Sequence, residues 1–208
     1  MPAKHPKEKH RKLLFWAATL AAYAALSCGV GLAAEPVSLV FNEQNGHYSV
    51  EGCFIVEADP ATAWKVLTDY DHIPDFVHDM KLSRIEGRWG NDLVLRQEAE
   101  GGFLFFTQKV HILLSVHEQP GHSIVFQDLS HKDFGFYQGS WGIQAQGSSV
   151  MVTYHLEALQ SFSAPAFLAS DAVHGGAQNL LSAVRQRIER EQEKKSVKAA
   201  IPTELAQR

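Results

Sequence analysis

The sequence predicts an α+β fold, with one antiparallel sheet and one long helix that covers a face of it. Beyond residue 46, successive segments alternate apolar and polar residues with the period of two that is typical of half-buried strands. Clusters of turn-forming residues separate these segments, which favours antiparallel neighbours joined by short loops. The C-terminal part changes to the spacing of an amphipathic helix. We expect about six to seven strands.

The first expected strand, residues 47–56, leads into two short helices. Asp59 has the side chain of a helix N-cap, and Pro60 suits the first helical position. Apolar residues then recur at helical spacing until the chain reaches Asp69 and Asp71, just before a proline-containing turn. These acids are open to two interpretations, a catalytic cluster or the caps and turns of a short helical segment. We favour the second.

The remaining expected strands lie between residues 92 and 159. In the longest of them, every even position from 104 to 116 is apolar except Gln108. Each strand has one polar face, so only one side of the sheet should be covered. In chain order these strands are residues 92–101, 103–118, 122–129, 136–145 and 149–159.

Residues 166–193 are expected to form the covering helix, with Ser163 as its cap and Pro165 in its first turn. Glycine inside a helix costs about 1 kcal/mol, so Gly175-Gly176 predicts a kink or a close approach to the sheet. A flexible joint at the mouth of a cavity is the alternative. The polar residues 194–208 are expected to be a disordered tail. The apolar stripe of the helix consists of Val173, Ala177, Leu180, Leu181, Val184 and Ile188.

The N-terminal residues 1–34 have the composition of a secretory signal peptide. Five basic residues precede an uncharged run of 14, and small residues suit a cleavage site after Ala33 or Ala34. Alternatively, the 22 uncharged residues 13–34 are long enough for an uncleaved membrane anchor. Cys28 fits a lipoprotein signal less well. Each interpretation predicts an exported domain, periplasmic or secreted if the segment is cleaved.

Removal of residues 1–34 leaves 14 Lys and Arg against 22 Asp and Glu, a net charge of about minus eight. Such an acidic domain lacks the positive field that nucleic acids require. One cysteine remains, so no internal disulfide can form. We expect residues 35–46 to be a linker and residues 47–193 to form one domain with its own core.

Motifs for metal, cofactor or nucleophile chemistry do not occur. The histidines include no H-E-x-x-H pattern, and there is neither a G-x-S-x-G elbow nor a glycine-rich phosphate loop. We therefore expect no metal and no cofactor.

Certain residues, together with the order of the expected strands and helices, resemble those of a known family. They are Ala58, Trp64, Val66, Leu67, Asp69, Tyr70, Pro74, Phe76, Gly139 and Trp141. With them the chain resembles the START-like superfamily of helix-grip folds, also called SRPBCC or Bet v 1-like, and within it the polyketide cyclase and coenzyme Q-binding branch. The resemblance covers roughly residues 47–190. It implies a curved sheet wrapped on the last helix, with a cavity for a hydrophobic small molecule between them.

The aromatic content of the chain, 12 Phe, 4 Trp and 5 Tyr, suits such a cavity. Gln108 and Gln97 occupy inward positions on two expected strands. Because a buried amide needs partners, each either bonds a neighbour or binds a ligand. The expected lining residues are Tyr70, Phe76, Leu95, Gln97, Phe106, Gln108, Val110, Trp141, Tyr154, Val173, Ala177 and Leu180.

We expect a non-catalytic protein that binds a hydrophobic small molecule such as a lipid, a quinone or a polyketide-like compound. The alternative is an aromatase- or cyclase-type enzyme that uses the same cavity, for which Asp128 is the best-placed acid. An interaction protein with a closed cavity is a third possibility. No nucleic-acid partner is expected, membrane association would require residues 13–34, and the oligomeric state does not follow from the sequence.

Overall fold

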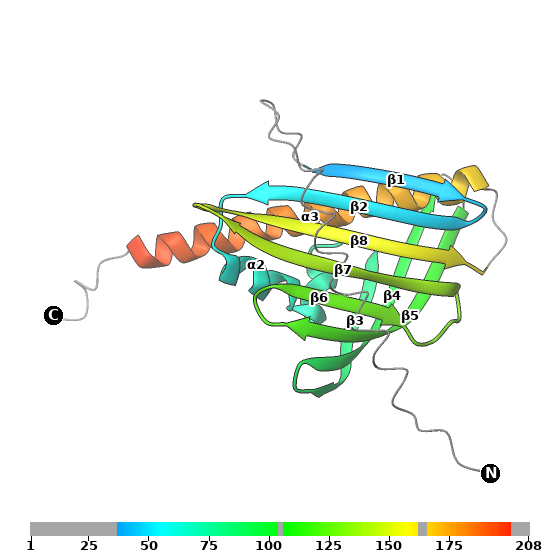
Figure 1. Cartoon of the computed structure of the whole chain (residues 1–208), viewed down its shortest axis with the longest axis horizontal. Helices are drawn as coiled ribbons and strands as arrows, with labels where there is room; N and C mark the ends of the chain where they lie inside the picture. The colour runs from blue at the N-terminus through cyan, green and yellow to red at the C-terminus, as the bar shows by residue number, and fades with distance from the viewer. Residues whose placement is uncertain (1–36, 104–105, 162–165, 201–208) are drawn as a thin grey trace, which may run out of the picture. The chain divides into compact units, whose positions relative to one another are not determined.

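The computed structural model describes the backbone of residues 37–103, 106–161 and 166–200, and their side chains except at 101–108, 160 and 166–171. The expected signal peptide or anchor lies outside these ranges. Figure 1 shows the elements in place. They are β1 (Ser38–Gln44), β2 (His47–Val56), α2 (Pro60–Leu67), the 3-10 helix η3 (Tyr70–Asp75), β3 (Met80–Trp89), β4 (Asp92–Phe103), β5 (Phe106–Gln119), β6 (Ser123–Asp128), β7 (Phe134–Gln146), β8 (Ser149–Gln160) and α3 (Ala166–Ala200).

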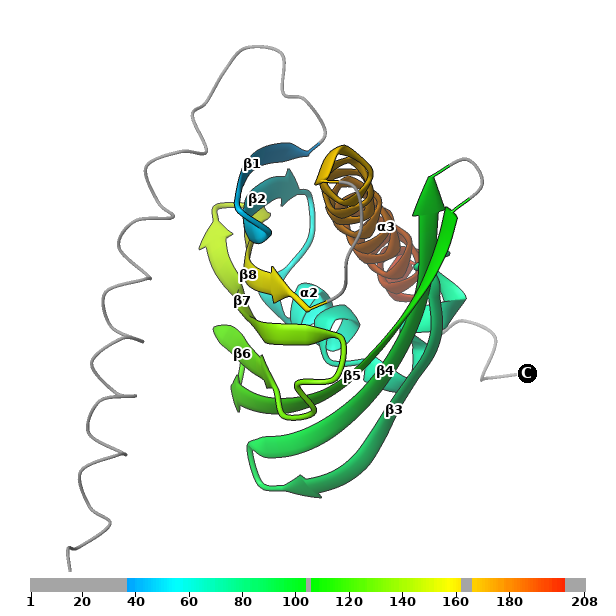
Figure 2. The same cartoon turned by 90° about the vertical axis from the view of Figure 1, so that its right-hand side faces the viewer.

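The strands form one antiparallel sheet in the order β1-β2-β8-β7-β6-β5-β4-β3. Strands β3 to β8 are a meander, and the β1–β2 hairpin continues the sheet beside β8. The sheet curves around α3 and α2, which both lie on its concave side (Figure 2). This arrangement confirms the expected α+β helix-grip fold, but with eight described strands instead of six to seven.

Strand β1 lies within the segment that the sequence analysis treats as a linker. It pairs with β2 from Ser38 to Gln44, and the two strands are joined by Asn45 and Gly46. Both joining residues have positive φ, 54° and 78°. Asn-Gly is the dipeptide that this tight hairpin turn prefers, because both central residues must adopt that conformation. The linker prediction for residues 35–46 is therefore wrong at this strand.

The second additional strand, β3, is the opposite edge of the sheet. Along its ten residues only Ser83 is buried, and two irregularities interrupt its pairing with β4. It therefore lacks the regular apolar alternation by which the other strands are recognisable. An edge strand with bulges and charged residues is protected against pairing with other chains.

The two short helices lie where the sequence places them. The Asp59 carboxylate accepts a hydrogen bond from the Thr62 backbone N–H at 2.8 Å, and Pro60 is the first residue of α2. The helix buries Ala63, Val66 and Leu67 in the core. A six-residue 3-10 helix, η3, follows it directly.

Helix α3 packs its stripe against the concave face, where Ala177, Leu181, Val184 and Ile188 are buried. The helix lies close to β2 at Gly52, where an added Cβ would overlap a methyl group of Leu181 if Leu181 did not move. Among the described residues, a Cβ on either Gly175 or Gly176 would meet nothing within 4 Å. The described part of the chain therefore does not show the close approach expected at those two glycines. Within the described ranges, no helix has both the length and the apolar character that crossing a membrane demands.

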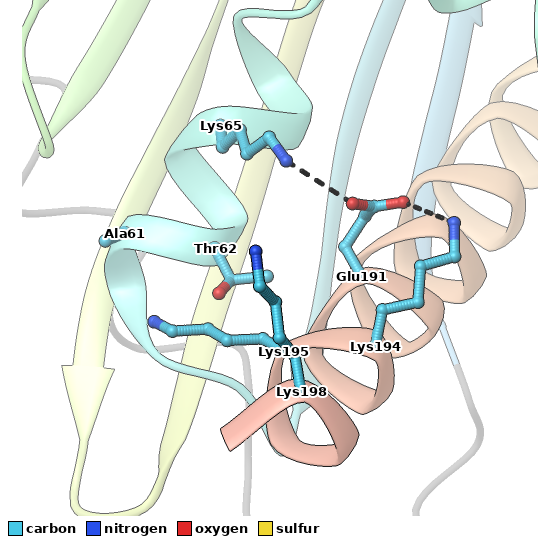
Figure 3. A pocket seen from close by; sticks show the side chains of 7 residues that line it. All are labelled: Ala61, Thr62, Lys65, Glu191, Lys194, Lys195 and Lys198. Atoms are coloured by element: carbon cyan, nitrogen blue, oxygen red, sulfur yellow. Dashed lines mark hydrogen bonds and ion pairs between the residues drawn. The ribbon is translucent and has the colours of Figure 1, made fainter. Parts of the chain in front are cut away.

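The helix also continues to Ala200, seven residues beyond its expected end, so residues 194–200 are helical and not a disordered tail. Ion pairs hold this end to α2 (Figure 3). Glu191 bonds Lys65 at 3.4 Å and Lys194 at 2.9 Å. Lys195 bonds Asp59 at 2.8 Å. The glutamate and the three lysines, with Lys198, line an open hollow of about 420 Å³. Because most of its charges are already paired with one another, we interpret the hollow as a joint between the two helices.

Replacing Asp59 by alanine is expected to lower the free energy of unfolding by about 0.5–2 kcal/mol, as lost N-caps do. The variant loses both the bond to Thr62 and the pair with Lys195. Asp59→Asn is the matched control, because asparagine caps as well as aspartate but cannot pair with a lysine. Urea denaturation of both variants separates the two contributions. If the asparagine variant loses as much as the alanine variant, the cap contributes nothing.

Candidate ligand-binding face

Five aromatic side chains gather on the concave face of β6, β7 and β8. The rings of Trp141 and Tyr154 lie 4.5 Å apart, and those of Phe134 and Tyr137 lie 5.1 Å apart. Phe126 lies between the two pairs, 6.0 Å from Tyr137 and 6.4 Å from Tyr154. Aromatic pairs at these separations attract one another beyond their area of contact. We call these five residues the aromatic wall.

Strand geometry explains how the wall forms. Tyr137, Gly139 and Trp141 alternate along β7 and therefore face the same side. A bulge between Phe134 and Phe136 shifts the register against β8. Phe134 consequently joins the concave face, whereas Phe136 stacks on His47 at 5.7 Å. Without the bulge, two residues spaced by two would share one face.

Tyr137 has a perturbed hydroxyl and is a half-buried residue. Burial raises the pKa of its hydroxyl to about 12; the neighbouring Tyr154 hydroxyl opposes the rise, and the charge of Asp128 adds to it. Trp141 is half-buried as well, whereas Tyr154 is buried. Tyr137 and Trp141 therefore keep accessible surface next to residues of the buried core.

The expected lining residues other than Gln97 fall into three groups. Tyr70, Leu95, Tyr154 and Ala177 are buried in the core. The half-buried residues Phe76, Val110, Trp141, Val173 and Leu180 pack against that core and keep accessible surface. The side chains of Phe106 and Gln108 lie outside the described part of the chain, so the expectation for Gln108 stays a prediction.

Gln97, the other expected amide, bonds a neighbour. Its side-chain nitrogen donates to the Ser83 hydroxyl at 3.2 Å, and the two residues are directly opposite on β4 and β3. Ser83 is buried. This contact accounts for one of the hydrogen bonds that a half-buried amide needs.

Tyr137, Phe126 and Phe134 are not among the site residues expected from the sequence. A signal for Tyr137 was present, since it precedes Trp141 by four residues on the same strand and must share its face. Phe126 stands directly opposite Gly139 on the neighbouring strand, which requires knowledge of the register. Phe134 depends on the bulge, which the sequence does not mark.

Asp128 is fully buried, 1% exposed, but its oxygens are occupied. It accepts bonds from the backbone N–H groups of Leu113, Ser130 and His131, at 2.9 to 3.1 Å, and from the Ser130 hydroxyl. It thereby holds the loop after β6 against β5, and His131 adopts a positive φ of 47° there. An acid bound in this way is a structural residue.

A second inward carboxylate, Glu118 at the end of β5, was not expected. It is 7% exposed and accepts two bonds from the Arg88 guanidinium, at 2.9 and 3.1 Å. Burial, followed by the nearby charge of Glu118, raises the pKa of Tyr70 well above its ordinary value. The Tyr70 hydroxyl is buried and has no hydrogen-bond partner within 3.5 Å among the described residues.

Metal binding has no support in the described part of the chain. It includes no group of three His, Cys, Asp or Glu that could hold a metal.

The acids of the helical segment have separate partners. Asp71 accepts a hydrogen bond from the Ile85 backbone N–H at 2.9 Å. Asp69 lies 2.6 Å from the Nδ1 atom of His72 and makes no capping bond with its side chain. These contacts fit turn-forming residues better than a catalytic cluster.

Replacing Asp69 by alanine is expected to destabilise the protein more at about pH 5 than at about pH 9. The hydrogen bond and charge of Asp69 raise the pKa of His72 above its usual 6.5. A raised pKa means that the pair stabilises fully below 6.5 and loses its contribution as the pH rises through the raised value. Urea midpoints at both pH values measure the difference. His72→Gln should remove it, and an equal loss at both pH values would contradict the pairing.

Comparison with known proteins identifies the family of the chain. Residues 56–185 match the family described as polyketide cyclase / dehydrase and lipid transport. The chain belongs to this family. The match begins at the last residue of β2 and ends within α3, so it spans the aromatic wall and most of the helix that faces the sheet. No curated protein matches the chain.

Solved structures similar to this family member include both binding and catalytic proteins. The STAR-related lipid transfer protein from Xanthomonas axonopodis has a TM-score of 0.62 at 16% identity, covering 77% of this chain and 97% of that one. The Zhui aromatase/cyclase from Streptomyces sp. R1128 has 0.59 at 14%, covering 74% and 98%. A START superfamily protein from Mycobacterium smegmatis has 0.59 at 18%, covering 70% and 99%. These structural similarities show that the chain has the same fold as these proteins.

Proposed function

We propose that this protein binds a hydrophobic small molecule, without catalysis, between the aromatic wall and helix α3. One observation carries the proposal: Tyr137 and Trp141 of the wall pack against the buried core and are themselves only half-buried. Protein interiors are normally close-packed, so accessible surface on these aromatic residues of the concave face indicates room for a ligand. Space lined by apolar and aromatic side chains is what a small-molecule site offers.

Other inward-facing residues support this interpretation. Trp141 on β7 and Val110 on β5 are both half-buried. From the helix side, Val173 and Leu180 are half-buried as well, whereas Leu181 on the same helix is fully buried. On the inward face of α3, the accessible surface therefore lies on the side of Val173 and Leu180, and not on the side of Leu181.

The arrangement favours binding over the aromatase or cyclase alternative. General acid or base catalysis needs a group that can reach the ligand and exchange a proton with it. Of the inward carboxylates named among the described side chains, Asp128 is occupied by its own loop and Glu118 by Arg88. The similarity to an aromatase/cyclase keeps the alternative open to test, and turnover of a ligand would support it.

Export is part of the proposal. The N-terminal composition supports a secretory signal peptide over residues 1–34, with a membrane anchor over residues 13–34 as the alternative. N-terminal sequencing of the protein from its membrane and soluble fractions tests this directly. Recovery of intact Met1 in the exported protein would exclude cleavage.

Native mass spectrometry of the purified full chain, followed by solvent extraction, tests ligand binding. A co-purified hydrophobic species is expected. Val110→Trp should reduce its occupancy, because a larger inward-facing side chain takes up accessible space on the concave face. Val125→Trp is the matched control, since Val125 is 44% exposed on the neighbouring strand. A chain that is empty and binds no added hydrophobic probe would contradict the proposal.

A further inference from the structure

The aromatic wall carries two hydroxyl groups, on Tyr137 and on Tyr154, and the two residues differ in burial. Tyr154 is 5% exposed, and its ring lies against Trp141. Tyr137 is half-buried. The two hydroxyls influence each other, because each shifts the pKa of the other. Because Tyr137 is the less buried of the two residues, its hydroxyl is the candidate for a polar contact with a molecule on the wall.

The wall has a defined electrostatic character. The described inward residues of β6, β7 and β8 include no Lys, Arg or His. Asp128 is buried on this face, and its charge acts on Tyr137. A ligand carboxylate beside Tyr137 would therefore lose its hydration, find no cation among the described inward residues of these three strands and be repelled by Asp128. A neutral oxygen would meet none of these costs.

From these observations we propose that the Tyr137 hydroxyl determines ligand specificity by donating a hydrogen bond to a neutral oxygen, such as that of a ketone. It selects such ligands against both plain hydrocarbons and carboxylates of the same shape. The inference rests on the proposed function, because it requires a ligand on the wall. The raised pKa of Tyr137 supports it, since the hydroxyl then keeps its proton at any physiological pH.

The arrangement of the aromatic rings also indicates the shape of the preferred ligand. Phe126, Phe134 and Trp141 present rings around the two tyrosines within 4.5 to 6.4 Å. Aromatic pairs favour offset or edge-to-face contact. A planar aromatic ligand with a carbonyl oxygen at its edge would make ring contacts and the hydrogen bond at the same time.

The test uses three probes with one tricyclic skeleton: fluorene, 9-fluorenone and fluorene-2-carboxylate. Their affinities are measured by quenching of tryptophan fluorescence in the full chain. We expect 9-fluorenone to bind about 2- to 10-fold tighter than fluorene, the net effect of one neutral hydrogen bond. The carboxylate should bind at least about tenfold more weakly than fluorene. In Tyr137→Phe the advantage of the ketone should disappear, and fluorene should bind as before.

Tyr70→Phe is the control, because the Tyr70 hydroxyl is buried and has no partner among the described residues. It should keep the full preference for the ketone. Retained fluorene binding shows that Tyr137→Phe is folded. A preference for 9-fluorenone that survives in Tyr137→Phe, or tighter binding of the carboxylate, would overturn the inference while leaving the proposed function intact. Failure of all three probes to bind would overturn both.

Discussion

Gly139→Ala is expected to destabilise the protein by about 3 kcal/mol or more, at or above the usual range for overpacking. A Cβ at this position would overlap the backbone carbonyl oxygen of His155 on β8 and lie 2.5 Å from the Cζ atom of Phe126. A side chain could rotate away, but a backbone carbonyl within a paired strand cannot. The β7–β8 pairing would have to open locally, and the Phe126 ring would be displaced from the aromatic wall.

Thermal and urea denaturation measure this effect, and Gly142→Ala is its control on the same strand. A Cβ on Gly142 would lie 2.5 Å from the side-chain oxygen of Thr153, which can change its rotamer. We expect a loss within about 1 kcal/mol for this variant. Equal losses in the two variants would show that glycine itself, and not the close approach, matters on β7.

The same glycine explains part of the family resemblance. Gly139 and Trp141 belong to the residues by which the chain resembles its superfamily. In the structure, the glycine leaves room for the Phe126 ring and for the neighbouring strand, and the tryptophan lies against Tyr154 on the concave face. The short motif therefore encodes both close strand packing and one half of the aromatic wall.

Regular alternation made most of the sheet predictable. Strand β2 has the expected bounds, 47–56, because its buried residues recur with a period of two. Strand β3 escaped prediction because a single buried residue, Ser83, carries no period. Strand β1 was missed although Asn45-Gly46 is a strong hairpin signal, since it also follows the expected signal peptide and resembles a linker.

The candidate site was less predictable than the fold because it depends on register and on local irregularity. Trp141 and Tyr154 stand opposite each other on β7 and β8, and both could be placed inward by alternation. Phe134 is inward only through a bulge, and the burial of Glu118 depends on Arg88 from a strand that was not expected. Sequence periodicity describes one strand at a time, whereas these contacts join two.

Replacing Arg88 by glutamine is expected to lower the free energy of unfolding by about 2–3 kcal/mol. The Glu118 side chain is 9% exposed and would lose both bonds to its cation. Removing one partner of a fully buried pair costs about 3–5 kcal/mol, because the remaining charge is left without hydration. The effect should be smaller here, since the Arg88 side chain is 38% exposed and water reaches that side of the pair.

The pair is tested with a double-mutant cycle by urea denaturation. Glu118→Gln should cost less than Arg88→Gln, because the half-exposed guanidinium left behind can be hydrated whereas the buried carboxylate cannot. The double variant should be more stable than Arg88→Gln alone, since it has no unpaired buried charge. The glutamine amide could also donate to the Tyr70 hydroxyl, which has no partner among the described residues. If Arg88→Gln costs no more than Glu118→Gln, the buried carboxylate is hydrated in solution and the proposed cause of the instability is wrong.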